Sequence, residues 1–193
     1  MEIGATKAVQ DRLKTTKIEE SKGASLVFCW DTHLTKIKGR NVLFIVNASN
    51  RYTLAMTDIE PRNWNYYTMY IRSVIHGVMQ EMGYSEDQIG QYFKMSGDTT
   101  VTKTHGRKSV GGINRMVMDA QYFGKKLEKE AKYQWELSKY LNRDICQPEG
   151  FDAYGYPSEL FKLDMERLGI ATKRKPAKVI DIAQYIENNR GTN

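Results

Sequence analysis

The stretch of residues 41–47, NVLFIVN, constrains the fold more than any other part of this sequence. Apolar residues fill the successive positions Val42 to Val46, so a β-strand here would be apolar on both of its faces. A strand of this kind is buried on both sides within a sheet. We therefore expect residues 41–47 to form a central strand.

Two further apolar runs lie on either side of this strand, at residues 26–37 and 51–56. Turn-forming residues separate the three runs, a pattern typical of an antiparallel meander. The threonine-rich residues 99–104 predict another strand of the same sheet, and residues 2–5 predict a short first strand. The sequence thus indicates an α+β fold, with an antiparallel sheet of about four to five strands packed by helices.

Apolar residues at helical spacing predict helices at residues 64–82, 113–141, 158–168 and 178–189. Thr6 stands at the N-cap position of an additional first helix. Ser85 and Gln88 have the spacing of a capping box for a helix that continues to about Met95. The stretch at 113–141 is the longest, and Ser109 is its expected N-cap.

Three regions are expected along the chain. Residues 1–145 form an α+β core domain that includes the long helix. Residues 146–171 contribute an aromatic loop and a helix that packs on the core, and residues 172–193 form a basic linker and a short C-terminal helix. With 193 residues, the chain is long enough for a core that needs no disulfide or metal.

The composition predicts a cytoplasmic protein without a membrane partner. Charged residues interrupt the N-terminal segment, as a signal peptide would not allow, and no apolar run approaches the roughly 20 residues of a membrane helix. The two cysteines, Cys29 and Cys146, are too few for a disulfide framework.

Positive charge is concentrated in residues 101–143, which hold ten basic and four acidic residues. This excess equals the formal net charge of the whole chain, +6. On a helical wheel, the basic side chains form one band that tyrosines flank. The band consists of Lys125, Lys129, Lys132, Lys139 and Arg143, with Tyr122, Tyr133 and Tyr140 beside it.

Lysines that neutralise phosphates, together with tyrosines that stack on unpaired bases, are typical of a nucleic-acid surface. An acidic protein partner would also fit this band, and the chain could form a homodimer. The alternative interpretation is a solvated outer helix face, whose long side chains cover the helix below.

A second polar group precedes the expected start of the long helix. Backbone N–H groups at a helix N-terminus and neighbouring glycines favour anion binding. The order of a phosphate-binding P-loop is absent, so an ordinary capped helix is the alternative. The candidate anion-binding residues are Arg40, Asn47, Arg51, Thr102, Lys103, Thr104, Arg107, Lys108, Ser109 and Asn114.

The sequence shows no catalytic motif and predicts neither a cofactor nor a metal site. Its histidines, His33, His76 and His105, have no carboxylate or cysteine at ligand spacing. Asp31 and His33 would share one face of a strand and could form an acid–base pair. The catalytic residues therefore stay unknown, and Cys29 is expected to be a buried thiol.

The order of several motifs resembles a family of bacterial, plasmid and phage proteins known as a domain of unknown function, DUF6933. The motifs are WDTHL, RNVLFIVNASNRY and TKTHGRKSVGGINR, and the resemblance covers roughly residues 2–123. The family usually has H-A-N after the tryptophan, where this chain has Asp31-Thr32-His33. The resemblance highlights Lys7, Trp30, His33, Arg40, Asn47, Arg51, Thr102, Lys103, Thr104, Arg107, Ser109 and Asn114.

Three functions remain open. The first is a non-enzymatic protein of a mobile element that binds nucleic acid or a nucleotide-like anion through its basic surface. The second is a phage or plasmid inhibitor of a host defence complex that acts by protein–protein contact. The third is an enzyme acting on a phosphate ester or nucleotide, with Arg40, Arg51 and Arg107 converging on the anion and His33 or Asp31 as base.

Overall fold

A computed structural model describes residues 1–14 and 18–172 of the chain. Five strands in this part form one sheet, with the order β4-β3-β2-β1-β5. The predicted central strand lies inside the sheet as β3, between β2 and β4. The strands are β1 (Glu2–Ala5), β2 (Cys29–Ile37), β3 (Arg40–Asn47), β4 (Thr53–Thr57) and β5 (Thr100–Thr102).

The sheet is mixed, and the prediction of an antiparallel sheet holds for only one half. Strands β2, β3 and β4 form the antiparallel meander, whereas β1 pairs in parallel with both β2 and β5. The reason is the connection after β1, where helix α1 (Lys7–Leu13) begins the return of the chain to the starting end of the sheet. Turn residues between consecutive strands indicate hairpins, but they carry no information about such a crossover.

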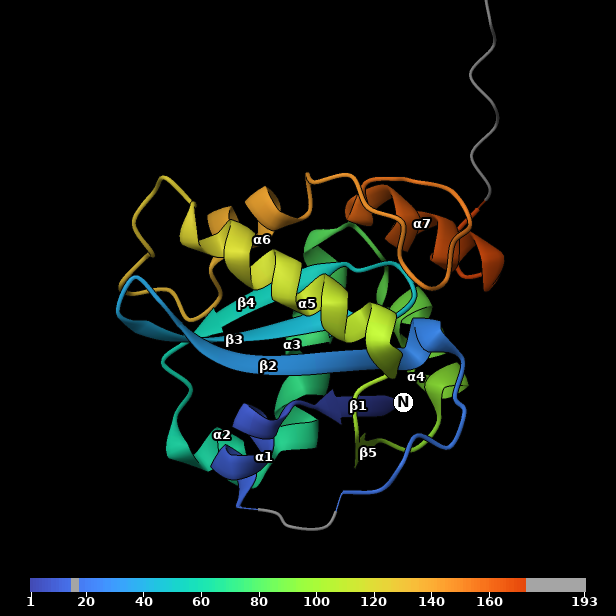
Figure 1. The fold of residues 1–193 in the computed structure, drawn as a ribbon. Helices are drawn as coiled ribbons and strands as arrows, with labels where there is room; N and C mark the ends of the chain where they lie inside the picture. The colour runs from blue at the N-terminus through green and yellow to red at the C-terminus, as the bar shows by residue number, and fades with distance from the viewer. Residues whose placement is uncertain (15–17, 173–193) are drawn as a thin grey trace, which may run out of the picture.

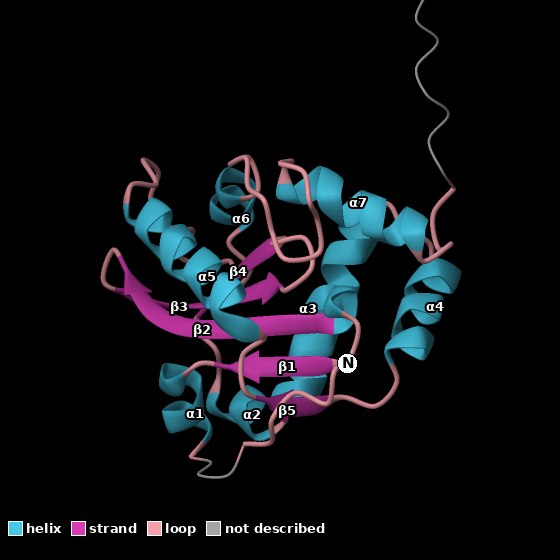
Figure 2. Cartoon of the chain, turned by 45° about the vertical axis from the view of Figure 1, so that its right-hand side comes forward, coloured by secondary structure: helices cyan, strands magenta, loops and turns pink. Residues whose placement is uncertain are grey.

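Seven α-helices occur in the described residues, and they cover both faces of the sheet (Figures 1 and 2). Helices α5 and α6 lie on one face, and α3 lies on the opposite face. Besides α1, the helices are α2 (Pro61–Asn65), α3 (Tyr67–Glu81), α4 (Glu86–Ser96), α5 (Gly106–Gln121), α6 (Trp135–Leu141) and α7 (Pro157–Arg167).

Alternation along β3 divides the core into two parts. Leu43 and Ile45 point toward the α3 side, into a large cluster that α4 and α7 also join. Phe44 and its neighbours in alternation point toward α5 and α6, into a smaller cluster. Every residue of β3 from Val42 to Asn47 is buried, as a strand covered on both faces requires.

The long basic helix expected at residues 113–141 is not present. Helix α5 ends at Gln121, and α6 begins only at Trp135. The buried amide of Gln134 organises the intervening loop: its oxygen accepts from the backbone N–H of Glu128, and its nitrogen donates to the carbonyl of Ala131. Buried side chains of the loop still face the core, so the apolar periodicity of the helix continues through it. On a helical wheel this periodicity is indistinguishable from that of a helix.

Several local predictions are confirmed. Residues 2–5 form β1, Thr6 is the N-cap residue of α1, and Ser85 and Gln88 form both hydrogen bonds of a capping box. Ser109 is not an N-cap, because α5 begins earlier and His105 occupies that position. The predicted helix at 64–82 is divided between α2 and α3 at Tyr66.

The predicted helix at residues 178–189 lies outside the described residues. Within the described part of the chain, no helix combines the length and the apolar character needed to cross a membrane.

Candidate functional site

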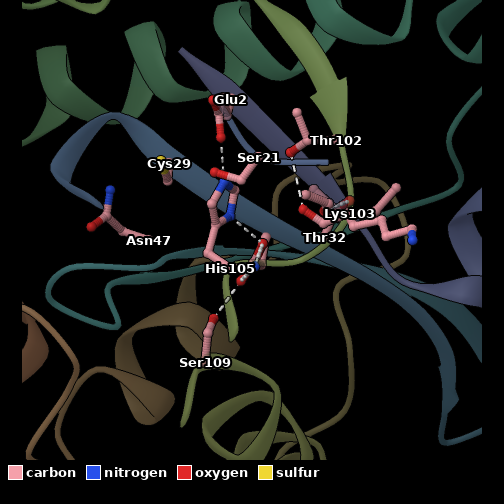
Figure 3. Close-up of polar contacts among 12 residues, drawn as sticks. Glu2, Ser21, Cys29, Thr32, Asn47, Thr102, Lys103, His105 and Ser109 are labelled. Atoms are coloured by element: carbon pink, nitrogen blue, oxygen red, sulfur yellow. Dashed lines mark hydrogen bonds and ion pairs between the residues drawn. The ribbon is translucent and has the colours of Figure 1, made fainter. Parts of the chain in front are cut away.

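A buried group of ionisable side chains lies between the sheet and the start of α5 (Figure 3). The parallel register places Glu2 of β1 beside Cys29 of β2, and Gly4 beside Asp31. Because alternate residues share one face of a strand, Glu2, Cys29 and Asp31 all face the same side of the sheet. His105, immediately before α5, reaches this group from the side of the sheet that α5 covers.

The imidazole of His105 lies between two carboxylates. Its Nδ1 is 2.7 Å from Oδ1 of Asp31, and its Nε2 is 3.0 Å from Oε2 of Glu2. The His105 and Glu2 side chains are 3% and 5% exposed, and that of Asp31 is fully buried. Glu2 also accepts hydrogen bonds from the backbone N–H of Lys22, at 2.8 Å, and from Ser21. This set of partners satisfies charges that would otherwise be costly to bury.

His105 carries a positive charge at neutral pH. Burial alone would lower the pKa of His105, but hydrogen bonds to Asp31 and Cys29 and the negative charge of Asp31 raise it to about 10. For the acid Glu2 the directions are reversed. Burial alone would raise the pKa of Glu2, but hydrogen bonds from Ser21, His105 and Lys22 lower it. The cluster is therefore an imidazolium held between acidic partners.

Asp31 also lies at the N-terminal end of α5. Its carboxylate accepts the backbone N–H of His105, at 3.2 Å to each oxygen, and the hydroxyl of Ser109. The partial positive charge of a helix N-terminus stabilises a nearby carboxylate. Asp31 thus connects the sheet, the imidazolium and the first turn of α5.

Gly4 makes this close approach possible. A Cβ atom at position 4 would lie only 1.9 Å from Oδ1 of Asp31 and 3.0 Å from the Cα atom of Thr104. Real Cβ atoms do not approach other atoms so closely, so a side chain here would push Asp31 away from His105. Glycine at position 4 is therefore a requirement of the cluster.

A basic pocket of about 260 Å³ adjoins the cluster along α5. Three cationic residues line it: Arg51 from the turn between β3 and β4, and Lys108 and Arg115 from α5. Ser109 also lines the pocket, and its hydroxyl is the group that donates to Asp31. A single side chain thus links the basic pocket to the buried cluster.

The turn that carries Arg51 has a constrained backbone. Arg51 has a φ of 62°, a left-handed conformation that is uncommon for a residue other than glycine. The Asn47 side chain stabilises the turn, because its Oδ1 accepts the backbone N–H groups of Ser49 and Asn50. The Arg51 side chain lies against Gly112 of α5, where a Cβ atom would be at an ordinary contact distance of 3.6 Å from its Cδ atom. Such strain is often found at binding sites.

The predicted anion-binding residues divide among several places. Asn47, Arg51, Lys108 and Ser109 line the basic pocket, while Thr104, Arg107 and Asn114 line a more open pocket on the neighbouring side of α5.

The three remaining predicted residues lie elsewhere. Arg40 pairs with Asp58 and donates to the carbonyl of Glu128, Lys103 pairs with Glu20, and Thr102 is buried. Arg40, Arg51 and Arg107 therefore do not line one common pocket.

The predicted basic band is divided by the end of α5. Lys125, Lys129 and Lys132 lie in the loop between α5 and α6, whereas Lys139 is in α6 and Arg143 follows it. Lys125 pairs with Glu136, and Lys132 pairs with Glu60.

The tyrosines of the band also differ in their surroundings. Tyr122 is 78% exposed, Tyr140 packs against Phe123, and Tyr133 lines a pocket that also contains Lys139 and Arg143. They do not form a continuous flank.

Sequence reasoning did not connect Glu2, Cys29 and His105, and it paired Asp31 with the wrong histidine. His33 instead has its Nδ1 3.2 Å from Oγ1 of Thr6, and burial lowers the pKa of its imidazole. Only the parallel pairing of β1 with β2 and β5 brings the cluster together. One available signal was Glu2, a carboxylate within an otherwise small and apolar first strand.

The fold and this site define a class of protein: an α+β domain with a mixed sheet, a buried acid–imidazolium cluster and an adjoining basic pocket. The model of the family described as Domain of unknown function (DUF6933) matches residues 2–160, which include the cluster and the pocket. The chain belongs to this family. Neither the curated proteins nor the solved structures contain a significant match to it.

Proposed function

We propose that this protein binds a phosphate-bearing ligand, a nucleic acid or a nucleotide-like anion, in the basic pocket beside α5. The observation that carries this proposal is the convergence of Arg51, Lys108 and Arg115 on one concave site that also contains glycines at positions 111 and 112. Cationic side chains bind phosphate oxygens, and glycines permit close approach of an anion to the backbone.

The charge balance of the pocket supports this function. Arg51 forms no ion pair with a carboxylate among the described residues; its side chain bonds to Cys146. Lys108 lies 4.0 Å from Glu149, at the outer limit of an ion pair, and Arg115 pairs with Asp119 at the exposed side of α5. A phosphate group would supply the missing counter-charge to Arg51.

Fluorescence anisotropy with a labelled mononucleotide and a labelled 5′-phosphorylated single strand tests the proposal across a salt series. Replacing Lys108 or Arg115 with Gln removes a charge from an exposed helix position, so the fold is expected to persist. Each substitution should weaken binding roughly 10-fold or more, the effect of losing one charged hydrogen bond. For the single strand, each should also reduce the slope of log affinity against log salt by about 1.

Lys139→Gln is the matched control, because this exposed lysine belongs to the predicted band but lies outside the basic pocket. Affinity should be nearly unchanged in this variant. A loss confined to Lys139→Gln would place binding at the band, and no binding of either probe at low salt would overturn the proposal.

A second candidate function is contact with a host protein, as expected of an inhibitor that a phage or plasmid encodes. The observation in its favour is the exposure of large side chains: Tyr66 and Met69 are 66% and 67% exposed, and Tyr154 is 71% exposed. Aromatic side chains of this size are typical anchors of protein interfaces. A nuclease-resistant, stoichiometric partner lost in Tyr154→Ala would support this candidate.

A further inference from the structure

The buried cluster contains three chemically different metal-ligating groups. A carboxylate oxygen of Glu2, the sulfur of Cys29 and a ring nitrogen of His105 all lie within 4.8 Å of one another. They come from β1, from β2 and from the loop before α5, so a shared ligand would join three separate segments of the chain. No feature of the basic pocket contributes to this set, which makes it independent of the proposed anion binding.

We propose that Glu2, Cys29 and His105 form a zinc-binding site that fixes the start of α5 against the sheet. Zinc is bound by the nitrogen of histidine, the sulfur of cysteine and carboxylate oxygens, and three protein ligands suffice when a fourth position is open. The mixture of nitrogen, sulfur and oxygen favours Zn²⁺ over Ca²⁺ or Mg²⁺, which prefer oxygen alone.

The distances suit this metal with little movement. Nitrogen and oxygen ligands each lie about 2.0–2.2 Å from a tetrahedral zinc, which places them roughly 3.4 Å apart. Nε2 of His105 and Oε2 of Glu2 are 3.0 Å apart, so they need to separate by only a few tenths of an ångström. Besides His105, the sulfur of Cys29 contacts the backbone carbonyls of Ala24 and Ser25, at 3.6 and 3.5 Å. These contacts are weak, so the sulfur can turn toward the metal.

Asp31 supports the proposed site without binding the metal itself. A histidine that binds a metal through one nitrogen almost always donates its other N–H to a carboxylate or carbonyl. Nδ1 of His105 is already 2.7 Å from Oδ1 of Asp31, which leaves Nε2 facing Glu2 and Cys29. Binding of Zn²⁺ releases one proton from Nε2 of the imidazolium and one from the Cys29 thiol to solvent.

Burial assigns this metal a structural role. The His105 and Glu2 side chains are at most 5% exposed, and Cys29 is fully buried, so a substrate cannot reach the ion. The metal would instead hold β1, β2 and the loop before α5 together, with a water molecule in its fourth coordination position.

The experiment is metal titration of the full chain after treatment with a chelator. With Zn²⁺, elemental analysis after dialysis should give one metal ion per chain, and the thermal midpoint should rise. With Co²⁺ in its place, a near-ultraviolet charge-transfer band should appear, because a thiolate binds the ion. The two cysteines are both buried and free, so Cys146→Ser is a matched control for Cys29→Ser.

The band should persist in Cys146→Ser and vanish in Cys29→Ser. Asp31→Asn should weaken zinc binding roughly 10- to 100-fold while retaining the band, as expected for a group outside the first ligands. If Cys29→Ser does not fold, the spectra of the wild type and Cys146→Ser still decide the question. Absence of stoichiometric zinc, absence of the band in the wild type, or its loss in Cys146→Ser would each overturn the proposal.

Discussion

The two faces of the same sheet differ in what they bury. Toward α3, β1 and β2 present apolar side chains such as Ile3 and Trp30 to the larger core. Toward α5, the same two strands present Glu2 and Asp31 near their starts, whereas Ile37 at the end of β2 joins the apolar cluster of β3 and β4. The change occurs within single strands, between residues that are neighbours in sequence.

The two faces of the sheet contribute differently to stability and to function. An apolar face contributes stability through burial alone, whereas a buried charged group is costly unless every partner is in place. Replacing such a group with apolar residues of similar size is often neutral or stabilising. A site that departs from simple apolar packing, with all its partners satisfied, is where function is expected. The α5 face of β1 and β2 is therefore the region to test.

The largest effect is expected from Asp31→Asn. The substitution keeps the size of the side chain but removes the charge beside the His105 imidazolium, and loss of one partner of a buried pair costs about 3–5 kcal/mol. Urea denaturation measures the loss, with the exposed Asp152→Asn as control. An unchanged free energy of unfolding would mean that the buried charge of Asp31 contributes no more to stability than a charge on the solvent-exposed surface.

Gly4→Ala should cost about 1–3 kcal/mol, because its Cβ would collide with Asp31 and overpack the cluster. Gly77→Ala is the matched comparison on the other side of the sheet. Gly77 lies within α3 and a Cβ there meets no atom within 4 Å, so alanine should add about 0.5–1 kcal/mol through helix propensity. Equal effects of the two substitutions, measured by thermal unfolding, would contradict the close contact.

Buried tyrosines on the apolar face should make the protein less stable in alkali. Burial raises the pKa of Tyr67 and Tyr92 well above their usual range, so the folded state holds their protons after the unfolded state has lost them. Their contribution is complete below pH of about 10 and is lost as pH rises above it, by about 1 kcal/mol per tyrosine at pH of about 11.

Denaturation between neutral and alkaline pH measures this slope, which Tyr67→Phe should reduce. Tyr122→Phe, at a residue that is 78% exposed, should leave the slope unchanged. The same slope in wild type and Tyr67→Phe would remove this tyrosine as its source.

The smallest effect is expected from Lys125→Gln in the loop that follows α5. Its ion pair with Glu136 is 2.5 Å long but exposed, and exposed pairs contribute little to stability. Salt should reduce even this difference, in contrast to Asp31→Asn, whose buried partners are little screened. A large loss of stability that resists salt would show that the loop is held by its charges rather than by Gln134.

Local patterns in the sequence predicted much of the local structure. Continuous apolar character identified β3, alternation and turn residues identified the meander, and Ser85 with Gln88 identified the start of α4. The length of the basic helix was wrong, because residues 122–134 keep an apolar period while Gln134 holds them as a loop. Part of the basic pocket was also anticipated, through Asn47, Arg51, Lys108 and Ser109.

The sequence by itself determined most of the strands and helices, because those preferences depend on residues within one or two turns of each other. Only the tertiary structure decided which polar residues meet. Glu2, Cys29 and His105 are far apart in the chain, and the parallel pairing of β1 with β2 and β5 brings them together. That pairing depends on a crossover and on burial across the whole sheet, which no local pattern records.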